Sequence, residues 1–122
     1  MPCKVMVVDD DPDIRDTISE VLQLEGFEVM SAENGADALG RLRQSPPTGL
    51  PDFLFLDLMM PVMDGWRLRT ELQQDARLKA IPVVAVTAST EKSRIRATFD
   101  GYLEKPVDLN VLLHTAESYC HP

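Results

Sequence analysis

Long apolar runs are missing from this 122-residue sequence, and positive charge is scarce. No stretch is apolar for long enough to span a bilayer, and the N-terminus lacks a signal-peptide pattern, so we expect a cytoplasmic protein. With 12 Lys and Arg against 20 Asp and Glu, the net charge of −8 argues against direct binding to nucleic acid or to an anionic membrane. The length suits one domain, 1–122.

Cysteine and histidine are also rare, with two residues of each type. Cys3 and Cys120 are far apart in the sequence, and in a reducing cytoplasm we expect two free thiols. A disulfide stays open as the alternative, because a first strand and a last helix can finish at the same end of a domain. His114 and His121 have no Cys or acid at zinc spacing, so we expect them to be surface residues.

The rest of the sequence alternates between short apolar runs and helical patterns. Helices are expected to begin after the capping residues Asp11, Asn34, Asp64 and Asp108. Strands are predicted at 4–8, 28–32, 53–56, 83–87 and 101–103. This alternation predicts an α/β domain with a parallel sheet that helices cover on both faces.

Carboxylates follow two of the apolar runs. Asp9 and Asp10 follow the first run, and Asp57 ends the third. The carboxyl ends of parallel strands meet at one edge, so we expect these acids close together, with Thr87 and Lys105 beside them. Clustered carboxylates repel each other, so either one of them is protonated or a cation lies among them, and Mg2+ prefers oxygen ligands. Asp57 is then a candidate nucleophile that forms an aspartyl phosphate, while Lys105 and Thr87 contact the phosphoryl group.

Five separated signals, in this order and spacing, resemble the response-regulator receiver domain of two-component signalling. They are Asp9-Asp10, Asp57, Pro61 with Asp64-Gly65, Thr87-Ala88 and Lys105-Pro106. The resemblance covers nearly the whole chain. It implies a flavodoxin-like, doubly wound sheet of five parallel strands in the order 2-1-3-4-5, with five helices.

The resemblance also implies a metal-binding and phosphoryl-accepting set of residues. In the family pattern, Asp57 is the phosphoacceptor, Asp10 binds Mg2+ directly and Asp9 holds a metal-bound water. The backbone carbonyl of Met59 matches the third protein ligand of the metal.

A second set of residues matches those that respond to the phosphoryl group. Thr87 and Lys105 match the residues that contact it, and the small Ala88 leaves the site open. Tyr102 matches the switch aromatic residue that turns inward when Thr87 moves. The Lys105-Pro106 bond is often cis in this family.

The function implied is that of a phosphorelay response regulator. A histidine kinase or a histidine phosphotransfer protein donates the phosphoryl group to Asp57, and the conformational change alters binding to a downstream protein. Such a chain catalyses only its own phosphorylation and dephosphorylation. The competing interpretation is an interaction module that no longer uses phosphorylation, and the intact acid set argues against it.

Two other acidic motifs fit less well. Asp9, Asp11, Asp13 and Glu20 take positions 1, 3, 5 and 12 of a calcium loop, but Ile14 stands at position 6, where that loop needs glycine. An aspartyl phosphatase of the haloacid type has Thr or Val where this chain has Asp13.

Two departures from the family pattern bear on output and lifetime. The segment 88–100 is missing about one helical turn, so we expect a short or irregular fourth helix near 90–98. In the family, that helix lies on a face that often carries output contacts and dimerisation. Because the Met59 side chain cannot hydrogen-bond an attacking water, we also expect slow hydrolysis of the aspartyl phosphate.

Overall fold

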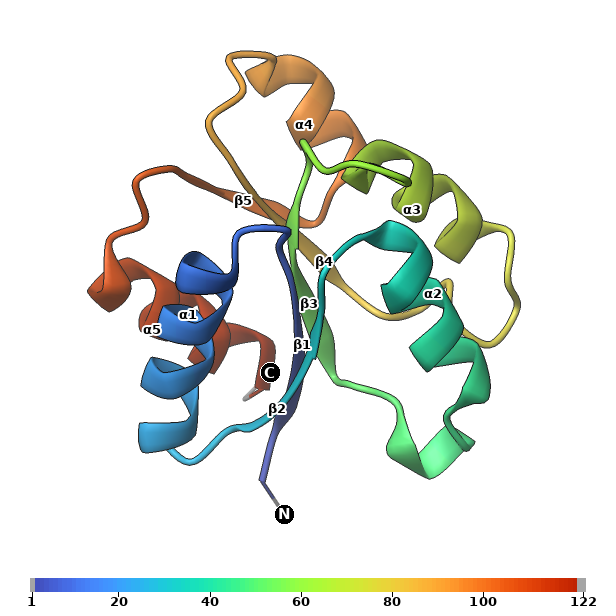
Figure 1. Ribbon diagram of the computed structural model, residues 1–122, viewed down its shortest axis with the longest axis horizontal. Coiled ribbons are helices and arrows are strands. Elements are labelled where there is room, and N and C mark those ends of the chain that lie inside the picture. Colours follow the sequence, from blue (N-terminus) through green and yellow to red (C-terminus); the bar gives the residue numbers. More distant parts are fainter. Residues whose placement is uncertain (1, 121–122) are drawn as a thin grey trace.

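The computed structural model describes residues 2–120, in which strands and helices alternate as the sequence predicts (Figure 1). The strands are β1 Lys4–Val8, β2 Glu28–Ala32, β3 Phe53–Asp57, β4 Val83–Thr87 and β5 Gly101–Glu104. The α-helices are α1 Pro12–Leu24, α2 Gly35–Gln44, α3 Gly65–Gln73, α4 Lys92–Thr98 and α5 Leu109–Cys120. A single 3-10 turn, Pro47–Gly49, lies in the proline-rich connection before β3.

The five strands form one parallel sheet in the order β2-β1-β3-β4-β5, which confirms the expected topology. Helices α1 and α5 cover one face, and α2, α3 and α4 cover the other (Figure 1). Successive side chains of a strand point to opposite faces, so along β1 Val5 and Val7 join the α1–α5 core, whereas Met6 and Val8 join the other. Strands β3 and β4 are buried throughout because both of their faces are covered. Among the described residues, no helix is long and apolar enough to cross a membrane.

Four helices begin at the capping side chains that the sequence predicts. The side-chain oxygens of Asp11, Asn34, Asp64 and Asp108 accept hydrogen bonds from backbone N–H groups in the first turns of α1, α2, α3 and α5. These bonds satisfy donors that have no partner within the helix. Asp11 is therefore occupied as a cap, which argues further against a calcium loop.

Helix α4 has only seven residues, and its first turn has no side-chain cap bond, so the expected short helix is confirmed. Its C-terminal end is held instead by Arg69 of α3, which is 9% exposed. The Arg69 guanidinium donates to the Thr98 carbonyl at 2.9 Å and lies 3.3 Å from an Asp100 carboxylate oxygen. The same Asp100 oxygen accepts the Val83 N–H at 2.7 Å. One buried cation thus ties α3, the end of α4 and the start of β4 together.

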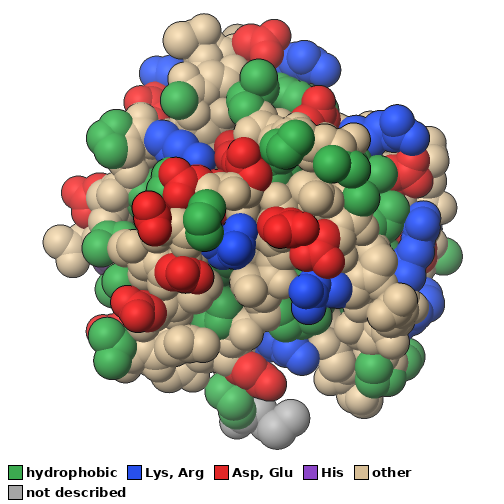
Figure 2. Space-filling view, viewed as in Figure 1, with side chains coloured by type: hydrophobic (Ala, Val, Ile, Leu, Met, Phe, Trp, Pro, Cys, Tyr) green, Lys and Arg blue, Asp and Glu red, His purple; other side chains and the backbone are tan. Residues whose placement is uncertain are grey.

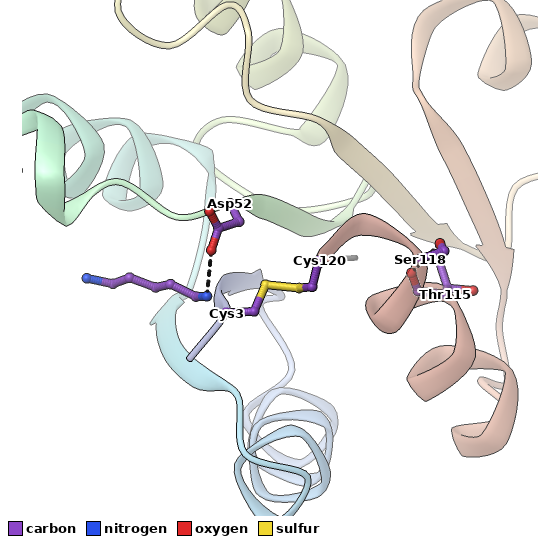
Figure 3. The surroundings of a disulfide bond; sticks show 6 residues. Cys3, Asp52, Thr115, Ser118 and Cys120 are labelled. Carbon is purple, nitrogen blue, oxygen red and sulfur yellow. Dashed lines mark hydrogen bonds between the residues drawn. A yellow bond between two sulfur atoms is a disulfide. The ribbon is translucent and has the colours of Figure 1, made fainter. Parts of the chain in front are cut away.

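Cys3 and Cys120 form a disulfide, so the expectation of two free thiols was wrong (Figure 3). Cys3 precedes β1, and Cys120 is the last residue of α5. The start of a parallel strand and the end of the helix that returns across the sheet lie at the same end of the domain, which brings the two Cα atoms to 5.9 Å. His114 is exposed, as expected, and His121 lies outside the described residues.

Gly65 opens α3 where the helix passes closest to β3. A Cβ atom there would lie 2.5 Å from the Asp57 carbonyl oxygen and 2.8 Å from the Leu58 Cα, so the backbone would have to shift. We expect Gly65→Ala to lower the free energy of unfolding by about 1–3 kcal/mol in a urea titration. A Cβ atom at Gly40, inside α2, would meet no neighbouring atom within 4 Å, so Gly40→Ala should raise that energy by up to about 1 kcal/mol. Equal effects of the two substitutions would contradict the close packing at Gly65.

Candidate functional site

Three carboxylates meet at the carboxyl edge of the sheet. Strands β1 and β3 are paired neighbours, with Val8 opposite Leu56, so Asp9 and Asp57 follow these residues side by side. One oxygen from each of Asp9, Asp10 and Asp57 lies within 4.8 Å of the others. Asp9 and Asp57 are only 2% and 5% exposed, whereas Asp10 faces solvent. The structure therefore brings together the acids that the sequence placed at this edge.

The Lys105 ammonium group lies between the two buried carboxylates. Its Nζ atom is 3.1 Å from Asp9 Oδ2 and 3.3 Å from Asp57 Oδ2. The backbone carries Lys105 to this position, because its N–H donates to the Thr87 carbonyl just past the paired ends of β4 and β5. The Lys105-Pro106 bond is cis, as the resemblance implies. Burial alone would lower the pKa of Lys105, but the two carboxylates outweigh it and raise that pKa above its usual value.

The pKa of Asp57 is raised well above its usual value. Burial, followed by the charge of Asp9, raises its pKa from 3.8 to about 6, against the lowering effects of Lys105 and of the Met59 N–H that donates to Asp57 Oδ1. One ammonium group therefore leaves three clustered carboxylates incompletely neutralised.

This donor set fits a hard divalent cation. All three side chains offer oxygen atoms, two of them are fixed by burial, and the exposed Asp10 leaves one side open to water. Mg2+ uses such sites, with one or two carboxylates and several retained waters. The acid cluster can thus bind a metal ion, and the Met59 carbonyl as a further ligand stays a prediction.

Thr87 ends β4 and is 1% exposed. It lies one residue beyond Val86, the residue paired with Asp57. Its hydroxyl oxygen accepts the Ser89 N–H at 3.0 Å, and among residues 2–120 no hydrogen bond uses the hydroxyl proton. That proton is free to be donated to an oxygen at the site.

Tyr102 does not lie in the acid cluster. It is half-buried on β5, where it pairs with Ala85, and its hydroxyl oxygen accepts a bond from Arg96 of α4 at 3.3 Å. The Arg96 guanidinium carbon also lies 5.5 Å from the centre of the tyrosine ring. Tyr102 therefore contacts α4, and its switching role stays a prediction.

Arg15 is a site residue that sequence reasoning missed. Its guanidinium donates to the Asp9 carbonyl oxygen at 2.8 Å, while Asp9 Oδ1 accepts the Asp11 N–H at 2.9 Å. These two bonds fix the backbone and the carboxylate of Asp9. The available signal was that Arg15 is the one Lys or Arg in the sequence of α1.

The loop between β3 and α3 holds a strained residue beside the acids. Val62 has φ of 70°, a region that β-branched residues rarely adopt, and the Met63 N–H donates to the Pro61 carbonyl across it. The Met63 carbonyl in turn accepts the Gly35 N–H at the start of α2. This bond anchors the loop, which carries the 71% exposed Met59 side chain.

A flavodoxin-like sheet with three carboxylates and one lysine at its carboxyl edge defines the class of phosphoryl-accepting α/β signalling domains. Residues 5–117 match the family described as the response regulator receiver domain. This chain therefore belongs to the response regulator receiver domain family.

Individual relatives agree with this assignment over nearly their whole length. PilH of Pseudomonas aeruginosa is 34% identical over 116 residues, which cover 92% of this chain and 93% of PilH. The polar-differentiation response regulator DivK of Brucella anthropi is 31% identical, with 98% and 97% covered. The structure of the chemotaxis response regulator CheY4 of Vibrio cholerae superposes with a TM-score of 0.86 at 29% identity, covering 98% of this chain and 99% of CheY4.

The family sets the kind of function. Receiver domains accept phosphoryl groups in two-component signalling, and response regulators are phosphorylated by histidine kinases. The expected family and fold are therefore confirmed.

The raised pKa of Asp57 predicts a pH-dependent stability without metal. The unfolded chain releases this proton near pH 3.8, but the folded chain releases it at about pH 6, so the contribution of Asp57 to stability is complete below pH 3.8 and is lost as the pH rises through about 6. We expect the free energy of unfolding of Asp57→Asn to exceed that of the parent by about 1–2 kcal/mol at neutral pH, after allowing for screening by water. Urea titration in EDTA measures both values. This advantage should vanish below about pH 4.

Asp64→Asn is the matched control, because asparagine caps a helix as well as aspartate does. It should show no such pH-dependent gain. An advantage of Asp57→Asn that is the same at both pH values would contradict the buried-charge explanation.

Proposed function

We propose that this chain is a phosphorelay response regulator in which Asp57 accepts the phosphoryl group. The observation that carries the proposal is the Lys105 ammonium group, 3.3 Å from Asp57 and 3.1 Å from Asp9 at an edge that also holds Asp10. A nucleophilic carboxylate, a fixed positive charge and a metal-ligand set are what phosphoryl transfer requires.

In the proposed reaction, a carboxylate oxygen of Asp57 forms a bond to phosphorus as the bond from phosphorus to the histidine nitrogen of the donor breaks. Asp9, Asp10, Asp57 and the Met59 carbonyl would hold Mg2+, which would supply positive charge to offset that of the phosphoryl oxygens. The Lys105 ammonium releases its contact with Asp57 and contacts a phosphoryl oxygen instead. The near-complete burial of Asp57 limits the access of bulk water to the acyl phosphate.

The proposed switch runs from Thr87 to Tyr102. The free Thr87 hydroxyl proton is donated to a phosphoryl oxygen, and the exposed, small Ala88 leaves room for that group. Movement of Thr87 opens space for the Tyr102 ring to turn inward, which breaks the contact with Arg96 on α4. The surface of α4 and β5 thereby changes, and binding to a downstream protein changes with it.

The proposed partner in phosphorylation is a histidine kinase or a histidine phosphotransfer protein with a basic docking surface. Figure 2 shows acidic side chains on the side of α1 and α5, whereas Lys and Arg side chains lie along α2 and α3. A basic partner is therefore attracted to the side of α1 and α5. We place this reaction in the cytoplasm, on a single domain, 1–122, that binds neither nucleic acid nor membrane directly.

Phosphorylation is tested by incubating the chain with Mg2+ and acetyl phosphate or phosphoramidate and measuring the intact mass. We expect a gain of one phosphoryl group that EDTA abolishes and that Asp57→Asn lacks. Lys105→Met should slow labelling by about a hundredfold, because a charge that stabilises the transition state is removed. Asp64→Asn, the cap control, should be labelled like the parent. No adduct together with no affinity for Mg2+ would favour the alternative of an interaction module.

Slow hydrolysis of the aspartyl phosphate is the second expected property. An amide at position 59 would hydrogen-bond the attacking water, and a bond worth about 1 kcal/mol corresponds to roughly fivefold in rate. Met59→Asn should shorten the lifetime of the phosphorylated chain by about this factor after the donor is removed, whereas Met59→Leu should leave it unchanged. A longer lifetime in Met59→Asn would refute the role of Met59.

A further inference from the structure

An open groove of about 1100 Å3 lies at the end of the sheet opposite the acid edge. The segment before β1, the turn between α1 and β2, and the last turn of α5 line it. Both cysteines of the disulfide are half-buried and line the same groove (Figure 3). The two bonded cysteines therefore border open space.

Contacts other than the disulfide hold Cys3 in place. Its carbonyl oxygen accepts the Glu28 N–H at 2.9 Å at the start of β2. The next residue, Lys4, donates its N–H to the Asp52 carboxylate at 2.8 Å and accepts the Asp52 N–H at 2.7 Å (Figure 3). Cys3 thus keeps its position whether or not its sulfur is bonded to Cys120.

Packing also brings the last turn of α5 to the same place. The Tyr119 ring stacks on Phe53 of β3, with 5.6 Å between ring centres. The Tyr119 hydroxyl lies so close to Gly101 that a Cβ atom there would come within 2.9 Å of it. Cys120 follows directly, so the two sulfur atoms stay neighbours when the bond between them is broken.

We propose that Cys3 and Cys120 form a reversible thiol–disulfide site whose redox state sets how firmly the last turn of α5 is docked. A thiolate from the groove attacks one of the two sulfur atoms, the Cys3–Cys120 bond breaks, and the released thiolate takes up a proton. A second thiol resolves the mixed disulfide, so that two external thiols leave as one external disulfide. The reverse exchange with an external disulfide restores the bond, because the two cysteines remain close together.

The charge of the groove selects among external thiols. Glu25, Glu28, Asp52 and Glu117 line it, against the single cation Lys4 among its described residues. An approaching thiolate that carries further negative charge is repelled, whereas a cationic thiol is attracted. The partner class is therefore a thiol reductant that is neutral or basic around its reactive sulfur.

The size of the covalent loop links redox state to stability. The two cysteines are 117 residues apart in the sequence, so the bond restricts nearly the whole unfolded chain. Reduction should lower the melting temperature by roughly 10 °C. In compartments that keep thiols reduced, disulfides of this kind are usually transient and serve catalysis or redox sensing.

The test follows free thiols, hydrogen exchange and melting in the native chain. When the oxidised protein is treated with cysteamine under native conditions, we expect Cys3 and Cys120 to become two free thiols. Treatment with cystamine should then restore the disulfide. In the reduced form, amides of 116–120 should exchange faster, and melting should match the Cys3→Ser/Cys120→Ser double variant. Reduction by cysteamine should be faster than by 3-mercaptopropionate at low salt, and Glu117→Gln should narrow this difference.

Each other outcome overturns the proposal. Two thiols that stay free in the presence of cystamine would show that the pair does not form a disulfide. A disulfide that is reduced only after denaturation would be a fixed structural bond. Thiol–disulfide exchange that changes neither the hydrogen exchange of the amides of 116–120 nor the melting temperature would show that the redox state does not affect α5. Labelling by acetyl phosphate reports on the opposite end of the sheet, so failure of the proposed phosphorylation would leave these results intact.

Discussion

The contact of one ammonium group with two buried carboxylates is the constraint on which the rest of the site depends. Lys105 joins Asp9 after β1 to Asp57 at the end of β3, and its own backbone is fixed by Thr87 at the end of β4. Lys105 thereby contacts the ends of three strands, two through its ammonium group and the third through its backbone N–H. Burial, and then the charge of Asp9, keep the pKa of Asp57 above its usual value despite Lys105. One ammonium group does not balance three acids, so the edge suits a divalent cation.

Contacts with neighbouring elements hold the short helix α4 in its place in the fold. A helix of seven residues has little stability of its own, so its position depends on packing. Arg69 supplies that packing by binding the Thr98 carbonyl and the Asp100 carboxylate, and the Trp66 ring lies against Phe99, with 5.3 Å between ring centres. The end of α4 is therefore tied to α3, whereas its contacts with β5 include two exposed pairs, Lys92 with Glu104 at 2.8 Å and Arg96 with Tyr102 at 3.3 Å.

Local sequence signals predicted most of the fold and of the acid edge. A few neighbouring residues are enough to recognise an apolar run that ends on Asp9 or Asp57, or a cap such as Asp64. The parallel topology then places the acids together. The contact of Arg15 with the Asp9 carbonyl gave no such signal, because it depends on the geometry of the turn between β1 and α1, which residue spacing does not show. Cys3 and Cys120 were misjudged because the assumption of a reducing compartment outweighed the geometric alternative.

The acid edge and the disulfide lie at opposite ends of β1 and of α5. These two elements differ in how firmly they are held. Strand β1 runs from beside Cys3 to Asp9, but ladders to β2 and β3 fix it on both sides. Helix α5 begins four residues after Lys105 and ends at Cys120, and side-chain packing through residues such as Leu112 holds it on the sheet. Packing contacts yield more readily than a paired central strand does. A change at the disulfide should therefore be felt first in α5, at whose end Cys120 lies.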